Sequence, residues 1–176
     1  MEVRLTSNGA EVRDSKQIYF GQSGAPDNDV YDKGSCVLHA LRWLVGDEAF
    51  FEALRRMAYP DPALERVTDG SQVRFADSED FVAIAERAAG AELGWFFETY
   101  LRRARLPQLH AQRAGDTLAL RWEAEGEQVF PLPVPLRVGA PDSGIRRVPM
   151  PDGRARIELP PGADYEVDPE GWLLRE

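Results

Sequence analysis

The chain has few side chains that could bind a metal or act as a nucleophile. Its 176 residues include two histidines, His39 and His110, and one cysteine, Cys36. Cys36 and His39 are three residues apart, so on a helix they face the same way and form a permissible pair of metal ligands. A closed zinc site needs four ligands, and the sequence offers no second close Cys or His pair. Packing along an apolar helical stripe with Val37 and Leu41 is therefore favoured over a metal site.

Two other kinds of site are disfavoured by spacing. A Cys–His nucleophile pair needs an exposed thiolate and an oriented imidazole, which positions three apart on a helix rarely provide. The loop of residues 21–24 contains two glycines but lacks the lysine and the strand context of a phosphate-binding loop. Residue types and spacing alone therefore indicate a soluble α+β chain of two parts.

Composition argues against nucleic-acid-binding, membrane-spanning and disulfide-bonded proteins. Lys and Arg number 21 against 30 Asp and Glu, a formal net charge of −9, which argues against a nucleic-acid partner because phosphates are neutralised by clustered cations. No stretch approaches eighteen consecutive apolar residues, and the N-terminus has no basic and apolar signal regions. We therefore expect no membrane partner and a cytoplasmic location. One cysteine excludes an intramolecular disulfide, so packing must hold the fold.

The spacing of apolar residues predicts four helices in the first part of the chain. The first helix covers residues 31–45, and the second is capped by Asp47 and ends before Pro60. The third is capped by Asp77 or Ser78 and ends at Gly90, and the fourth covers residues 93–105. The arginines that end the last helix suit the negative end of a helix dipole, which is favoured over an anion site. Residues 1–29 are rich in turn formers, with one extended run at Gln17–Phe20, and resemble a segment taken from something longer.

After Leu106-Pro107 the apolar period changes from near four to two, which indicates strands. The predicted strands are 108–113, 117–124, 128–138, 145–149, 154–159, 165–167 and 172–174. The prolines at 131, 133 and 135 cannot donate to a ladder and predict a sheet edge. The expected fold class is α+β, a bundle of about four helices followed by a small antiparallel β-sandwich. Residues 1–106 would form an extended segment and helical lobe, and residues 107–176 the sandwich domain.

Five segments resemble the M1 family of zinc aminopeptidases, in the same order. Tyr31-Asp32-Lys33-Gly34 matches the family's Tyr-x-Lys-Gly, and Gly46-Asp47-Glu48-Ala49-Phe50 its Gly-Asp-x-x-Phe. The third segment, Asp77-Ser78-Glu79-Asp80-Phe81, is similar to the family's Thr-x-x-Asp-Phe, with Asp in place of Thr. The fourth, Leu93-Gly94-Trp95-Phe96-Phe97, is similar to Leu-x-Trp-Phe-Phe. The fifth, Arg105-Leu106-Pro107, is similar to Gly-x-Pro but lacks the Gly. The resemblance covers roughly residues 29–107, which makes it more specific than any single short motif.

The resemblance implies a catalytic role for Tyr31. In the family, this tyrosine points at the zinc site and donates a hydrogen bond to the tetrahedral intermediate of peptide hydrolysis. A phenol is protonated at neutral pH and so can donate. A donor positioned at a developing oxyanion contributes on the order of 10² to 10³ in rate. Asp32, Lys33 and Gly34 match the motif as its scaffold and are given no chemical step.

The chain also departs from the family. The His-Glu-x-x-His zinc motif, the downstream Glu ligand and the Gly-x-Met-Glu-Asn strand are absent from the sequence. The resemblance therefore implies the C-terminal part of such an enzyme, the helical half of the catalytic domain plus the sandwich. This chain would bind no cofactor itself, with zinc held in the full-length enzyme. Its partners would be the missing N-terminal half and, in full-length form, a peptide substrate. Alone it should be inactive.

An alternative from another class is a catalytically dead, peptidase-like interaction module that reuses the same scaffold. An open reading frame that continues upstream through a His-Glu-x-x-His helix would support the enzyme, and an in-frame stop would support the module. Without the zinc-bearing half, the helices that begin near Tyr31 and Asp47 should expose an apolar face, and such faces favour association. A homodimer through this face is therefore expected.

Overall fold

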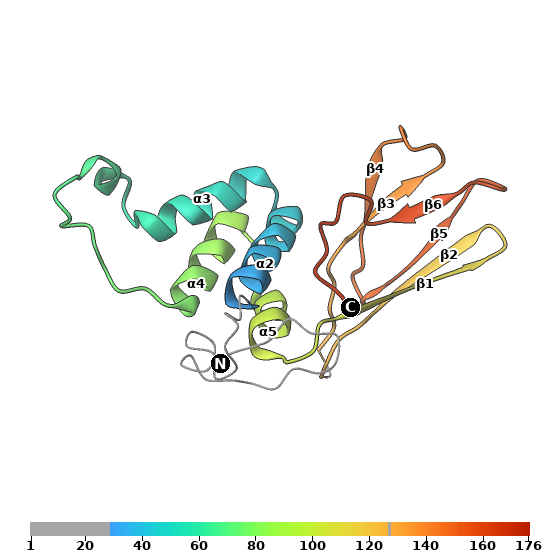
Figure 1. Cartoon of the computed structure of the whole chain (residues 1–176), viewed down its shortest axis with the longest axis horizontal. Helices are drawn as coiled ribbons and strands as arrows, with labels where there is room; N and C mark the ends of the chain where they lie inside the picture. The colour runs from blue at the N-terminus through green and yellow to red at the C-terminus, as the bar shows by residue number, and fades with distance from the viewer. Residues whose placement is uncertain (1–28, 127) are drawn as a thin grey trace, which may run out of the picture. The chain divides into compact units, whose positions relative to one another are not determined.

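The computed structural model describes residues 29–126 and 128–176 (Figure 1). The extended run predicted at Gln17–Phe20 lies outside the described residues. Contacts divide the described residues into two compact units, one of Leu41–Gly94 and one that combines residues 29–40 with Trp95–Glu176. The predicted domain boundary after residue 106 stays a prediction.

The Leu41–Gly94 unit is helical. It contains α3 (Asp47–Ala58), the 3-10 helix η1 (Pro62–Arg66) and α4 (Ser78–Ala89), and α3 packs against α4. The cap of α4 confirms the sequence prediction, because the Asp77 carboxylate accepts from the Asp80 N–H and the Asp80 carboxylate accepts from the Asp77 N–H, each at 3.0 Å. Gly90 ends the helix in the left-handed conformation that glycine adopts without strain.

The start of α3 differs from the prediction. α2 (Asp29–Val45) and α3 are separated by Gly46 alone, which has a φ of 83° and is itself the N-cap residue. Asp47, the predicted cap, is therefore the first helical residue. Its carboxylate instead accepts two hydrogen bonds from the Arg42 guanidinium, at 2.7 and 2.8 Å, and these bonds lower the pKa of Asp47.

The second unit contains the beginning of α2, the helix α5 (Gly94–Arg102) from Trp95 onward, and two antiparallel sheets (Figure 1). One sheet has the order β1 (Gln108–Ala114), β2 (Thr117–Glu123), β5 (Arg154–Glu158). The other has the order β4 (Ile145–Val148), β3 (Val134–Val138), β6 (Tyr165–Val167). Within residues 29–126 and 128–176, four α-helices and two small antiparallel sheets confirm the predicted α+β class. No helix in the described part of the chain is both long and apolar enough to cross a membrane.

The proline-rich strand was predicted at a sheet edge, and this is wrong. The strand covers only residues 134–138 of the predicted 128–138, and β3 lies in the middle of its sheet, between β4 and β6. The Pro135 carbonyl points toward β6 and accepts from the Asp168 N–H at 2.8 Å, one residue beyond the end of β6. In an antiparallel strand the N–H and C=O of one residue point to the same side, so the N–H that proline lacks would also face this position. The β3–β6 ladder ends there, and Pro135 therefore interrupts neither ladder of β3.

The strand predicted at 172–174 does not form. Asp168 has a φ of 55° and turns the chain after β6. Its carboxylate accepts from the backbone N–H groups of Trp172 at 2.7 Å and Leu173 at 3.1 Å. A side chain thus takes the place of a partner strand for these two donors.

Candidate functional site

Tyr31 lies in the first turn of α2 with its side chain in solvent. Its exposed fraction is 64%, whereas Lys33 is 5% exposed and Val37 and Ala40 are buried. Lys33, Val37 and Ala40 follow the spacing of one helix face, and Tyr31 lies about 200° around the axis from Lys33. The helix therefore buries one side from Lys33 onward and presents the Tyr31 phenol on the other.

The other residues of the motif differ in what they do. Asp32 is exposed, and its carbonyl accepts from the Ser35 hydroxyl at 2.9 Å. Gly34 lies in the helix outside the left-handed region, and a Cβ added there would meet no atom within 4 Å. Neither space nor backbone conformation within the described chain therefore requires glycine at position 34.

We expect Gly34→Ala to stabilise the isolated chain by about 0.5–1 kcal/mol, because alanine loses less backbone entropy than glycine inside a helix. Urea denaturation followed by circular dichroism measures the change. The matched control is Gly90→Ala, which should destabilise because Gly90 has a φ of 62°. A Gly34→Ala chain less stable than wild type would mean that Gly34 has a close neighbour beyond the described residues.

Cys36 and His39 were predicted to pack in the apolar stripe of α2, and the structure contradicts this. Both side chains are exposed, because they lie beside the face that buries Val37 and Leu41 and not within it. The His39 ring stacks on the Trp172 ring, with 4.3 Å between centroids and 8° between planes.

The described residues do not fit a zinc ion. No group of three His, Cys, Asp or Glu side chains that could hold a metal exists in residues 29–126 and 128–176. Cys36 and His39 therefore lack the further ligands that a zinc site requires. No step of catalysis is assigned to a metal held by these residues.

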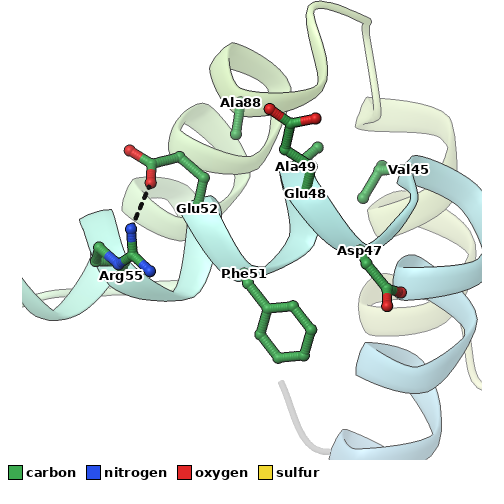
Figure 2. A pocket seen from close by; sticks show the side chains of 8 residues that line it. All are labelled: Val45, Asp47, Glu48, Ala49, Phe51, Glu52, Arg55 and Ala88. Atoms are coloured by element: carbon green, nitrogen blue, oxygen red, sulfur yellow. Dashed lines mark ion pairs between the residues drawn. The ribbon is translucent and has the colours of Figure 1, made fainter.

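A separate hollow of about 650 Å³ lies in the Leu41–Gly94 unit and contains none of the predicted site residues (Figure 2). It is lined by Val45, Asp47, Glu48, Ala49, Phe51, Glu52, Arg55 and Ala88. In Figure 2 the Phe51 ring lies on the side of α3 away from Ala88. Glu52 is paired with Arg55 at 3.6 Å, so its charge is already compensated. Asp47 is likewise paired with Arg42 at 2.7 Å, and we assign the hollow no catalytic role.

The observation that bears on the predicted homodimer is the exposure of aromatic side chains on the helices. Tyr31 on α2 and Phe51 on α3 are 64% and 47% exposed, and the Arg42 guanidinium carbon lies 5.2 Å from the centre of the Phe51 ring. Scattered exposed aromatics are ordinary on monomers. Self-association through the helical part stays a prediction.

Comparison with known proteins finds a sequence match to one aminopeptidase and a fold match to another. No protein-family profile matches the chain. Aminopeptidase N of Lactococcus lactis subsp. lactis is 32% identical over 163 residues, an alignment that covers 82% of this chain and 18% of that protein. The crystal structure of Legionella pneumophila aminopeptidase A in complex with aspartic acid matches with a TM-score of 0.57 and 15% identity, over 80% of this chain and 17% of that one.

Both relatives are much longer than this chain, which spans less than a fifth of each. At 15% identity the structural match establishes a shared fold and nothing more. The sequence match is the stronger finding because it combines 32% identity with coverage of 82% of this chain. The chain is therefore related in sequence to an aminopeptidase and shares its fold with part of another.

Proposed function

We propose that this chain acts as the C-terminal segment of a zinc aminopeptidase of the M1 type and supplies the oxyanion-binding tyrosine, Tyr31. The observation that carries the proposal is the exposed Tyr31 phenol on a helix anchored by the buried Lys33. Its support is the Tyr-x-Lys-Gly motif at these positions and the 32% identity to aminopeptidase N.

The chemistry assigned to Tyr31 is hydrogen-bond donation. When water attacks a peptide carbonyl, negative charge develops on the carbonyl oxygen, and a preorganised O–H donor stabilises that charge. Exposure leaves the Tyr31 hydroxyl accessible to a substrate held by another part of the protein. The zinc ligands, the general base and the grip on the peptide amino terminus would all come from outside the described residues.

The decisive experiment is the intact mass of the natural gene product together with its activity on aminoacyl p-nitroanilides. A product much larger than the 19.7 kDa of this chain that releases nitroaniline supports the proposal. A 19.7 kDa product without activity contradicts it and supports the interaction module, because a chain of this size lacks the zinc motif.

We predict that the isolated chain binds no zinc stoichiometrically and hydrolyses no aminoacyl substrate, because its described residues offer no set of three metal ligands. Elemental analysis after dialysis measures the metal content. The longer product, prepared in the same way, is the control and should retain zinc. One tightly held zinc per isolated chain would overturn the prediction.

A further inference from the structure

The C-terminal segment Asp168–Glu176 connects three other parts of its own compact unit. The Trp172 ring stacks on His39 of α2. The Leu174 carbonyl accepts from the Tyr100 hydroxyl of α5 at 2.8 Å, and the Glu176 N–H donates to the Pro107 carbonyl, just before β1, at 3.1 Å. None of these contacts belongs to a strand ladder or a helix. They hold the segment through one side chain, Trp172, and two backbone groups, the Leu174 carbonyl and the Glu176 N–H.

The conformation of this segment is fixed by Asp168. Besides the bonds from its carboxylate to Trp172 and Leu173, its carbonyl accepts from the Gly171 N–H at 3.1 Å. The Trp172 indole N–H donates to the Glu170 carboxylate at 2.9 Å. The indole is therefore oriented by its own loop before it meets His39, which lowers the entropy lost in forming the stack.

The contact with α5 is equally well defined. Tyr100 is fully buried, and burial, with a smaller effect from the Asp168 charge, raises the pKa of its hydroxyl far above the ordinary value. The hydroxyl therefore stays protonated at neutral pH and remains a donor to Leu174. The partly buried bond to the Leu174 carbonyl and the His39 stack together place the segment against two helices of the same unit.

His39 and Tyr31 lie on the same helix, eight residues or about 12 Å apart along its axis. A continuous helix transmits the placement of one turn to the next, so a partner that holds His39 also limits the tilt and rotation of the turn that carries Tyr31. Small displacements of a positioned donor are costly, because catalysis depends on its geometry.

We propose that the segment Asp168–Glu176 is a clasp that positions Tyr31, with His39 and Trp172 as its positioning residues. The catalytic part of this inference rests on the proposed function, whereas the mechanical part concerns the isolated chain. The interaction that holds the clasp is aromatic stacking, so a flat ring at either position should preserve it.

The mechanical part is tested by amide hydrogen exchange in the 176-residue chain. Trp172→Ala and His39→Ala should each accelerate exchange of the α2 amides 33–40 by about 3- to 10-fold, the range expected for loss of one aromatic pair. Trp172→Phe and His39→Phe should restore most of the protection. His110→Ala, which removes an exposed histidine on β1, is the matched control and should leave α2 unchanged.

A second readout reports the stack directly. In the wild-type chain the His39 ring protons should be shifted upfield by the Trp172 ring current, and Trp172→Ala should abolish this shift. If Trp172→Ala fails to fold, His39→Ala carries the same test without touching the C-terminal segment. Unchanged exchange of amides 33–40 in a folded His39→Ala chain would overturn the clasp.

The catalytic part requires the longer, zinc-bearing enzyme. There Trp172→Ala should lower kcat by about 3- to 10-fold with KM unchanged, and Trp172→Phe should recover kcat. If Tyr31→Phe lowers kcat and Trp172→Ala does not, the clasp is refuted while the proposed function stands. If Tyr31→Phe has no effect, the proposed function fails, and the exchange data alone decide whether the clasp holds α2.

Discussion

Replacing Tyr31 by Phe is expected to lower kcat of a zinc-bearing enzyme that contains this chain by a factor on the order of 10². The lost hydrogen bond forms chiefly in the transition state, so KM and zinc content should stay near wild type. Tyr31 is 64% exposed, and removal of its hydroxyl leaves the packing of α2 intact. Steady-state kinetics on an aminoacyl p-nitroanilide, with metal analysis of the same preparation, measure the effect.

The matched control for this substitution is Tyr165→Phe, which removes a tyrosine hydroxyl from β6 and should leave kcat unchanged. Circular dichroism of both variants verifies that the fold is retained. A Tyr31→Phe enzyme whose kcat stays within a few-fold of wild type would show that the Tyr31 hydroxyl does not bind the oxyanion, and the proposed function would lose its central residue.

The helices could be predicted from sequence because their signals are local. Asp77 and Asp80 are three residues apart, the spacing of a reciprocal cap, and Gly90 supplies the left-handed residue that ends α4. The hairpin of β1 and β2 could also be predicted, since two runs of alternating apolar and polar residues are joined at Gly115, which has a φ of 61°. Each of these features is decided by residues within about one turn of each other.

Sheet position could not be predicted in the same way. The proline at position 135 indicates a missing donor, but whether that donor is needed depends on where β6 ends, about thirty residues later in the chain. The Trp172 and Leu173 N–H groups likewise find a side-chain acceptor, Asp168, and not a strand. Pattern alone does not distinguish these two ways of satisfying a backbone donor.

The position of Tyr31 on a helix could be predicted from the sequence, whereas its role in a site stays a prediction. The motif identified Tyr31, and apolar spacing placed it at the start of a helix, both from adjacent residues. The burial of Lys33 and the exposure of Cys36 and His39 depend on what packs against each face of α2. The stack of His39 on Trp172 joins residues from distant parts of the sequence, so no local signal reveals it. His39 lies outside the predicted apolar stripe and contacts Trp172 instead.

The largest stability effect is expected at Trp122 of β2. Its side chain is 6% exposed, its indole N–H donates to the Leu132 carbonyl at 2.7 Å, and its ring meets Phe130 edge to face at 5.1 Å. The Phe130 ring in turn lies 5.4 Å from Trp95 and 5.6 Å from Tyr100, so this aromatic cluster joins α5 to β2 and to the segment between β2 and β3. Removing Trp122 therefore opens a cavity beside Phe130 and leaves the buried Leu132 carbonyl without its donor.

We expect Trp122→Ala to lower the free energy of unfolding by about 3–5 kcal/mol, the range for loss of a large buried aromatic side chain. Trp122→Phe keeps most of the ring but loses the N–H, and should cost about 1–3 kcal/mol through the unpaired Leu132 carbonyl. Urea denaturation followed by far-ultraviolet circular dichroism compares the variants without relying on tryptophan emission. Phe75→Ala removes a fully exposed aromatic ring and serves as the control, with an expected change within about 0.5 kcal/mol. A Trp122→Ala cost below about 1 kcal/mol would mean that the cluster is not what stabilises this unit, because a buried ring of this size cannot be removed from a close-packed core so cheaply.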